Sequence, residues 1–133
     1  MMRNYIWVAT GGALGSVLRF GLSGAIANWR GGTFPWDTLV INVTGSFLIG
    51  LFAALTGPDG RWLVPEGFRT FFMLGICGGY TTFSSFSLQT LKLAESGDWL
   101  KAGANVAGSG IFCLLAVWLG HLLALYLSSA KGH

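Results

Sequence analysis

Charged side chains are scarce in this sequence, and their scarcity excludes most kinds of soluble domain. Only 10% of the 133 residues are Asp, Glu, Lys or Arg, whereas 53% are hydrophobic. Soluble domains usually carry about 25% charged residues. A chain with this balance is expected to fold with lipid as its solvent. Its net charge of +3 is spread along the chain, so no nucleic-acid-binding patch is indicated.

Metal-binding and nucleophilic motifs are also missing. The two cysteines, Cys77 and Cys113, lie in apolar segments, and the sequence has neither a C-x-x-C motif nor a Cys/His cluster. A disulfide framework and a zinc site are therefore not indicated, and both cysteines are expected to be small packing residues. A membrane enzyme would need a nucleophile–base pair or a metal set. Since Cys77 and His121 stand on separate segments without a third partner, we do not expect an enzyme.

No acidic residue lies inside a long apolar segment. Four acidic residues stand at segment ends and one in a connection, namely Asp37, Glu66, Glu95, Asp98 and Asp59. Proton-coupled small multidrug antiporters, which also have four spans, need an embedded carboxylate for which protons and cationic substrates compete. The sequence therefore excludes that class of transporter.

Four apolar segments are long enough to cross a membrane. A hydrocarbon core of roughly 30 Å needs about 20 helical residues. The segments span residues 5–28, 38–56, 68–93 and 102–127. The short connections hold most of the charge, glycine and proline. In or beside them stand four tryptophans that suit a lipid–water interface, namely Trp29, Trp36, Trp62 and Trp99. We predict a single four-span membrane domain over residues 1–133.

The positive charges are nearly balanced between the two ends of these segments. Four stand on the side of both termini and the second connection, and three on the opposite side: Arg3, Arg61, Arg69 and Lys131 against Arg30, Lys92 and Lys101. Lys and Arg near span ends set membrane orientation. So small a bias allows insertion in both orientations with an antiparallel homodimer, and it equally allows an ordinary single orientation.

Two ionisable residues stand inside the apolar segments, where such residues are candidates for function. Arg19 lies about 21 Å of helix beyond Tyr5. Its guanidinium either reaches the interface, positions the structure, or concentrates anions at a vestibule, and we favour a positioning role. Arg19 also argues against a cleaved signal peptide, although residues 25–27 form an A-x-A-like triplet. His121 stands near a segment end and is expected to be a packed or interfacial residue.

Small residues recur at spacings that let membrane helices approach each other closely. Gly11 and Gly15 form a G-x-x-x-G motif, and Ser46 and Gly50 form its small-x-x-x-small relative. Both spacings predict helix–helix contacts.

Uncharged polar residues form stripes on two segments. The second segment carries Thr38, Asn42, Gly45 and Ser46 at helical spacing, and the fourth carries Asn105, Ser109 and Cys113. An amide in hydrocarbon without a partner costs several kcal/mol, so both asparagines must face protein or water. Interhelical hydrogen bonds explain single residues, at about 0.6 kcal/mol each. Two parallel stripes favour a lined pathway.

The stretch "GICGGYTTFSSFS" at residues 75–87 interrupts the third segment. Glycine costs about 1 kcal/mol relative to alanine in a helix, and threonine is stiff at χ1, so we predict a break near Tyr80 and Thr81. Broken helices at membrane depth are buried in protein or line a cavity, and they expose backbone carbonyls that bind ions. Beyond the break, Phe83 and Phe86 share a face with hydroxyl groups. They either pack or present electropositive ring edges to an anion.

Three stretches of the sequence together resemble the Fluc (CrcB) fluoride channel family over essentially the whole chain. They are "GGYTTFSSFS" in the third segment, "INVTGSFLIG" at residues 41–50 and "GGALGSVLRFGLS" in the first segment. The resemblance implies an all-α integral membrane protein of the bacterial plasma membrane. Its four transmembrane helices, the third of them broken, would assemble as an antiparallel, dual-topology homodimer. The dimer would export fluoride passively through two pores and hold a structural sodium ion (Na+) at its centre.

The resemblance also implies roles for individual residues. The backbone carbonyls of Gly78 and Thr81 would bind sodium, the ring edges of Phe83 and Phe86 would contact fluoride, and Asn42 would donate a hydrogen bond in the pore. The remaining expected pore residues are Ser84, Thr82, Thr38, Ser109 and the embedded Arg19. Asn105 stands where some members of the family have a pore tyrosine. A structural or regulatory membrane subunit remains the alternative, although it needs neither the break nor the stripes.

Overall fold

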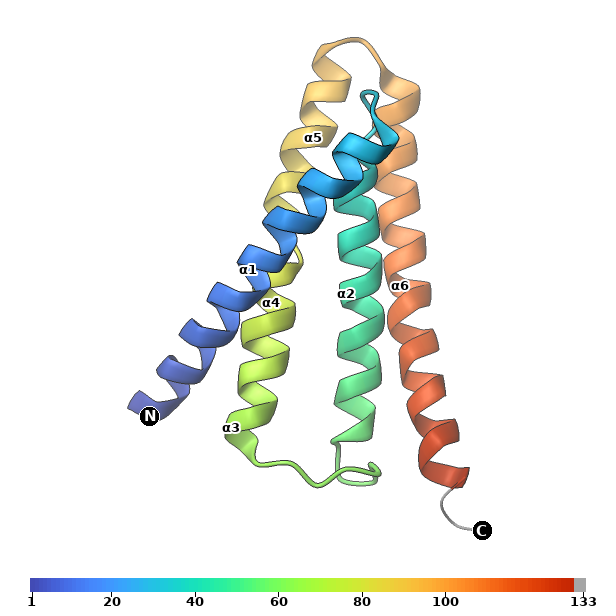
Figure 1. Cartoon of the computed structure of the whole chain (residues 1–133). Coiled ribbons are helices and arrows are strands. Elements are labelled where there is room, and N and C mark those ends of the chain that lie inside the picture. The colour runs from blue at the N-terminus through green and yellow to red at the C-terminus, as the bar shows by residue number, and fades with distance from the viewer. Residues whose placement is uncertain (131–133) are drawn as a thin grey trace.

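The computed structural model describes residues 1–130, and the regular secondary structure of this part of the chain is helical, with no strand. Its elements, in chain order, are α1 (Met2–Arg30), α2 (Trp36–Leu55), α3 (Glu66–Arg69), η1 (Thr70–Cys77), α4 (Gly78–Tyr80), α5 (Phe83–Glu95) and α6 (Trp99–Ser129). The elements from α3 to α5 form one segment in which η1 is a wide-turned π-helix. The described chain therefore has four long helical segments, and the third is interrupted (Figure 1).

The four segments run alternately up and down. The start of α1, the end of α6 and the α2–α3 connection lie at one end of the molecule, and the other two connections lie at the opposite end (Figure 1). The end with the start of α1 therefore carries Arg3, Arg61 and Arg69, and the opposite end carries Arg30, Lys92 and Lys101. Lys131, which the sequence places with the first group, lies outside the described residues.

Two of the four segments, α2 and α6, are apolar enough over a sufficient length to cross a membrane. α1 has the length, but it is diluted by glycine, serine and Arg19. The third segment has the composition in its first half, but the break divides it into short pieces. The structure thus agrees with four segments, and length and composition single out two of them as spans.

Glycines determine how closely the helices pack. A Cβ at Gly50 of α2 would overlap the backbone oxygen of Val117 in α6, and one at Gly120 of α6 would overlap that of Phe47. On the other side of the molecule, Gly11 and Gly15 press in the same way on the backbone of the third segment. The contacts predicted from the small-residue spacings of Gly11, Gly15 and Gly50 are confirmed.

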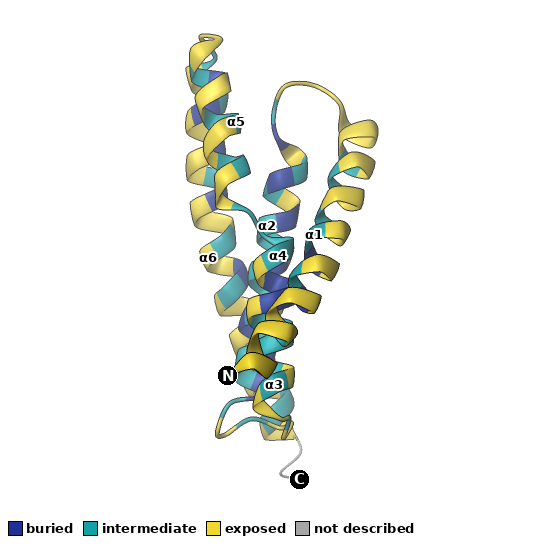
Figure 2. Cartoon of the chain, turned by 90° about the vertical axis from the view of Figure 1, so that its left-hand side faces the viewer, coloured by how far each residue is buried: buried dark blue, intermediate teal, exposed yellow. Residues whose placement is uncertain are grey.

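The outer surface of the bundle is strongly apolar. Figure 2 shows exposed residues along the outward faces of α1, α5 and α6, with the buried residues confined to the seams between helices. Many of the exposed side chains are large and hydrophobic, such as Phe20, which is 84% exposed. A soluble monomer rarely exposes apolar surface on this scale. This surface is the one expected of a membrane protein.

Candidate functional site

The third segment is broken at two residues in the middle of the bundle. Thr81 (φ −83°, ψ 156°) and Thr82 (φ −151°, ψ 115°) are extended, between the end of α4 at Tyr80 and the start of α5 at Phe83. The Thr82 hydroxyl accepts a hydrogen bond from the Ser85 amide at 3.1 Å and so caps α5. The predicted break is confirmed, and its extended residues are Thr81 and Thr82.

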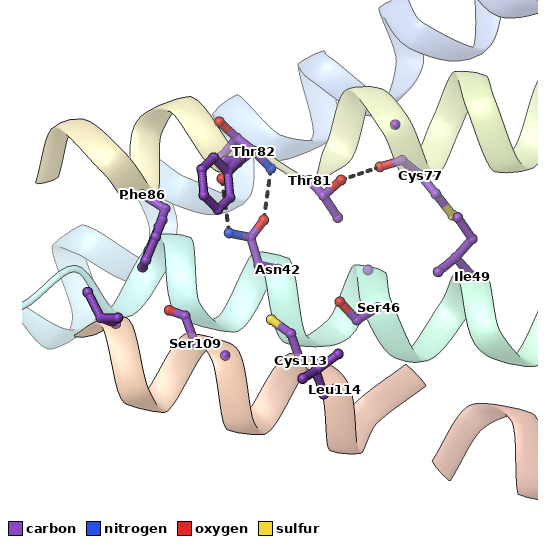
Figure 3. A pocket seen from close by; sticks show the side chains of 15 residues that line it. Asn42, Ser46, Ile49, Cys77, Thr81, Thr82, Phe86, Ser109, Cys113 and Leu114 are labelled. Carbon is purple, nitrogen blue, oxygen red and sulfur yellow. Dashed lines mark hydrogen bonds between the residues drawn. The ribbon is translucent and has the colours of Figure 1, made fainter. Parts of the chain in front are cut away.

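Asn42 of α2 is paired with the backbone of the break. Its Nδ2 donates to the Thr82 carbonyl at 3.0 Å, and its Oδ1 accepts from the Thr82 amide at 2.8 Å (Figure 3). In a continuous helix that amide would donate to the carbonyl of Gly78, four residues earlier. Asn42 therefore pairs with both backbone polar groups of Thr82. Because it takes the Thr82 N–H, the carbonyl of Gly78 is left without its helical donor.

Two carbonyls at the break are left without a donor. Among residues 1–130, no hydrogen bond reaches the backbone oxygens of Gly78 and Thr81. The neighbouring Cys77 carbonyl, by contrast, accepts from both the amide and the hydroxyl of Thr81. Gly78 is exposed and Thr81 half-buried in the single chain, so both oxygens are open to a partner such as water, a ligand or another protein chain. The two carbonyls predicted to bind a cation therefore have free lone pairs.

Arg19 contacts the same stretch of backbone from α1. Its Nε donates to the carbonyl of Gly79 at 3.0 Å, just before α4 ends. A cation at a helix C-terminus is favourable because carbonyl dipoles converge there. This contact fits the positioning role that we favoured for Arg19.

A cavity of about 660 Å³ opens beside the break, between α2, the third segment and α6. We call it the break groove (Figure 3). Of the residues predicted to bind ions, those that line it are Asn42, Gly78, Thr81, Thr82, Phe83, Phe86 and Ser109. No charged residue is among its lining residues. The groove is thus an apolar cleft with a few neutral polar groups.

The two phenylalanines lie at the start of α5. Their ring centroids are 5.3 Å apart and the ring planes are inclined by 46°. Phe83 is 79% exposed within a single chain, although it also lines the break groove. Phe83 is thus part of the apolar surface that the single chain leaves to lipid or to another protein chain.

Asn105 does not line the groove. Its side chain is completely buried, its Nδ2 donates to the Thr90 hydroxyl of α5 at 2.9 Å, and its Oδ1 accepts from Ser109 at 3.4 Å. The prediction of a lined pathway along the α6 stripe is therefore wrong at Asn105, because this amide finds its partners in protein. Ser109 and Cys113, further along the stripe, do face the groove.

Comparisons with known proteins confirm the family resemblance of the sequence motifs. The family model described as "CrcB-like protein, Camphor Resistance (CrcB)" matches residues 6–121. A "Fluoride-specific ion channel FluC" of Opitutus terrae is 61% identical over 131 residues, which cover 98% of this chain and 99% of the relative.

Relatives of the same name from two other bacteria are equally similar. The protein of Paramagnetospirillum magneticum is 66% identical over 123 residues, covering 92% of this chain and 96% of the relative. That of Rhodospirillum rubrum is 62% identical over 125 residues, covering 94% and 97%. The chain belongs to the CrcB family.

Within this CrcB-family chain, three of the expected pore residues lie outside the break groove. Thr38 is buried at 3% exposure, and Arg19 is engaged with Gly79. Ser84 is exposed, and its hydroxyl lies 3.4 Å from that of Thr82. A fluoride-contacting role for these three residues stays a prediction that the single chain does not support by proximity.

The groove of the CrcB-family chain also has lining residues that sequence reasoning did not assign to a site. Ser46 and Cys113 were recognised only as members of stripes, and Cys77 only as a packing residue. The sequence does carry a signal for Ser46 and Cys113. Ser46 follows the predicted pore residue Asn42 by one helical turn, and Cys113 follows Ser109 in the same way, so each pair shares a helix face. For Cys77 no signal existed, since a lone cysteine in an apolar segment normally packs.

Proposed function

We propose that this member of a fluoride channel family is itself a fluoride-selective channel that lets fluoride leave the cytoplasm passively. The observation that carries the proposal is the break groove, an apolar cleft with a few neutral polar groups that a single chain leaves open in the middle of the bundle. The names of the three relatives support fluoride as the ion.

The groove provides neutral hydrogen-bond donors for fluoride and no positive charge that would hold the ion too tightly. Fluoride must exchange tightly held water for other donors, because an isolated buried anion costs tens of kcal/mol in a low-dielectric medium. The Asn42 amide has two N–H groups and uses one on Thr82, so one remains for the ion. The hydroxyl of Ser46 also lines the groove. Neutral donors bind an anion weakly enough to release it, as conduction requires.

The aromatic rings supply a second kind of contact. The edge of a phenylalanine ring is electropositive and attracts an anion. Phe86 lines the groove, and Phe83 stands at its exposed margin. In this proposal both rings turn an edge toward the fluoride path, with Phe83 completed by contacts from a second chain.

We propose that the second chain is another copy in the opposite orientation. The polar groups of this cleft cannot face lipid, because hydrocarbon would leave its donors and carbonyls unpaired. A two-fold dimer covers the groove of each subunit and repeats it, which gives two pores. The described ends carry three basic residues each outside Arg19, a balance that suits insertion in both orientations.

The two free carbonyls fit a sodium ion at the dimer axis. Gly78 and Thr81 present neutral oxygen ligands, and a two-fold axis would double them to four. Bound there, the cation would supply a fixed positive charge that offsets the cost of bringing an anion into the bilayer. The role of this chain is to hold the carbonyls free. Asn42 takes the Thr82 amide, which a helix would give to Gly78. The Thr82 hydroxyl takes the Ser85 amide, which a helix would give to Thr81.

Fluoride efflux from liposomes tests the function directly. Liposomes that contain only this protein and are preloaded with fluoride should release it down its gradient without any other coupled ion. Liposomes without protein and chloride-loaded liposomes serve as controls. Retention of fluoride, or equally fast chloride release, would contradict the proposal.

The sodium and dimer proposals have separate tests. Replacing sodium by N-methylglucamine should lower dimer stability, because a ligand bound only to the folded dimer stabilises it by mass action. A Cβ at Gly78 meets only the Met73 backbone oxygen, at 3.9 Å, so the single chain has room for the β-carbon that Gly78→Val adds. This variant should keep its helicity and lose the sodium effect. A dimer indifferent to sodium would argue against the ion.

Orientation is tested by biasing the charges. Adding three lysines at one end should force one orientation and abolish flux when that variant is expressed alone. Coexpression with an oppositely biased copy should restore it. Full flux from one biased variant alone would contradict the antiparallel dimer.

A further inference from the structure

A second cavity lies at the end of the bundle that holds the α1–α2 connection. Its volume is about 190 Å³, and it shares no lining residue with the break groove. The end of α1, the connection from Gly31 to Pro35, the start of α2 and Gln89 of α5 form its walls. We call it the connection pocket. Nothing in the proposed fluoride path uses it.

The connection that forms this pocket has a defined shape. Gly31 and Gly32 have positive φ angles of 59° and 84°, which glycine adopts without strain. The Thr33 hydroxyl accepts a hydrogen bond from the Lys101 ammonium of α6 at 2.7 Å. Lys101 in turn pairs with Asp98 at 3.3 Å. The connection is thereby tied to the neighbouring α5–α6 connection and gives the pocket fixed walls.

The pocket carries one positive group, Arg30, and one negative group, Asp37, and the two do not form an ion pair. The Arg30 guanidinium stacks over the Trp36 ring at 4.5 Å and over Trp29 at 5.7 Å. No carboxylate of the described residues pairs with it. Asp37, on the same pocket, accepts a hydrogen bond from Ser23 through one of its two oxygens. A ligand therefore meets a held cation and an acceptor within one small cavity.

Gln89 adds an unsatisfied acceptor. Its Oε1 is buried and has no hydrogen-bond partner among the described residues. A buried acceptor left unpaired costs about 1–3 kcal/mol. A fully deprotonated inorganic anion would pair with Arg30 but has no N–H or O–H to donate to this oxygen. The Gln89 oxygen needs a hydrogen-bond donor. Because the Asp37 carboxylate on the same pocket is negative, a positively charged donor suits both groups.

We propose that the connection pocket binds the phosphoethanolamine headgroup of a membrane lipid. The phosphate pairs with Arg30, and the primary ammonium donates to Asp37 and to Gln89 Oε1. The position suits a lipid, because Trp29 and Trp36 flank the pocket and tryptophan concentrates at lipid–water interfaces. Acyl chains then run along the exposed apolar face of α1, which includes Leu18 and Leu22.

Headgroup chemistry gives the proposal a sharp test. Purified protein in detergent is titrated with phosphatidylethanolamine, phosphatidylcholine or phosphatidylglycerol, with thermal unfolding and native mass spectrometry as readouts. Phosphatidylethanolamine should bind at least about tenfold more tightly than phosphatidylcholine, whose methylated nitrogen has no N–H to donate. Phosphatidylglycerol should also bind more weakly, since it has no ammonium group. Detergent removes any effect of membrane orientation.

Variants tie the preference to the pocket. Gln89→Leu and Arg30→Gln should each abolish the preference for phosphatidylethanolamine. Arg61→Gln is the matched control, because Arg61 lies in the connection at the other end and donates to the Leu127 carbonyl. It should keep the preference. The lipid series on the unmodified protein stands by itself if a variant fails to fold.

Several results would overturn the proposal. Equal binding of phosphatidylethanolamine and phosphatidylcholine would show that the ammonium donates no hydrogen bond in the pocket. Tightest binding of phosphatidylglycerol would indicate a simple anion site. Soluble phosphoethanolamine or inorganic phosphate, if as effective as the lipid, would indicate a free phosphate ligand. Slower fluoride flux in Gln89→Leu with an intact lipid preference would assign the pocket to a pore mouth instead.

Discussion

Before the break, the third segment packs backbone to backbone against α1, whereas after the break it makes little contact of that kind. Gly75 and Gly79 face Gly11 and Gly12 so closely that a Cβ on either would overlap α1. In α5, beyond the break, only Leu93 is buried, although the helix has thirteen residues. One continuous stretch of sequence thus contains a half fixed by its own chain and a half left largely open.

This difference separates the structural role of the segment from its functional role. The first half places the break at a defined depth because glycine contacts fix it on α1, and Arg19 reinforces it through Gly79. The second half carries Phe83, Phe86 and the hydroxyls, and its packing is unfinished in one chain. In the proposed dimer, the second half is where the partner and the ion make contact.

The largest expected effect is on stability, and it comes from disrupting the glycine contacts between α1 and the first half of the third segment. Gly15→Leu would drive a side chain into the backbone of Ile76 and Tyr80. Overpacking against backbone should cost about 3 kcal/mol or more and leave little folded protein. The measurement is the thermal midpoint and the monodisperse yield in detergent. Gly21→Leu on the same helix serves as control, because a Cβ at Gly21 meets no atom within 4 Å. Equal stability of the two variants would refute the tight contact.

The next largest effect is expected where the two halves meet. Asn42→Ala leaves both polar groups of the Thr82 backbone unpaired at the break. The variant also loses the N–H that Asn42 offers to the ion. A hydrogen bond to a charged group is worth about 1.5–3 kcal/mol, so fluoride flux per folded dimer should fall roughly tenfold to a hundredfold.

Asn105→Ala is the comparison for this prediction, because Asn105 is equally an amide but binds Thr90 of α5. It should lower the thermal midpoint more than the flux. If both variants lose flux in equal measure, Asn42 has no special role at the break.

A smaller effect is expected in the open half. Phe83→Ile and Phe86→Ile keep much of the apolar bulk but remove the electropositive ring edge. Each should reduce fluoride flux per reconstituted dimer by about tenfold, since aromatic contacts contribute up to roughly 1.5 kcal/mol. If the rings merely pack, stability should fall by about 1–3 kcal/mol with flux nearly intact. Efflux rate and thermal stability are measured side by side for each variant.

The smallest effect separates two neighbouring hydroxyls. Ser84 is exposed and approaches Thr82 only at 3.4 Å, longer than a good O–H···O bond, so Ser84→Ala should change flux by less than about twofold. Thr82→Val removes the cap of α5 and should cost about 1 kcal/mol. Flux and stability are compared in both variants. A larger loss in Ser84→Ala would assign Ser84 to the ion path.

The sequence by itself determined the features that depend on local pattern. Four apolar segments, the glycine spacings and the break follow from residues close together in the chain, because helix periodicity and glycine's poor helix propensity act over a few residues. The break could be located to within a residue. The family, too, is written in short motifs, and "GGYTTFSSFS" points to it without any knowledge of contacts.

Only the tertiary structure decided which polar groups satisfy one another. Asn42 and Asn105 look alike in sequence, yet one pairs with Thr82 across 40 residues and the other with Thr90 across 15. Arg19 finds Gly79 at a separation of 60 residues. The local sequence pattern indicates that a buried amide or guanidinium needs a hydrogen-bond partner. Which residue becomes that partner follows from the packing of the helices. That packing also left the Gly78 carbonyl free and Phe83 exposed.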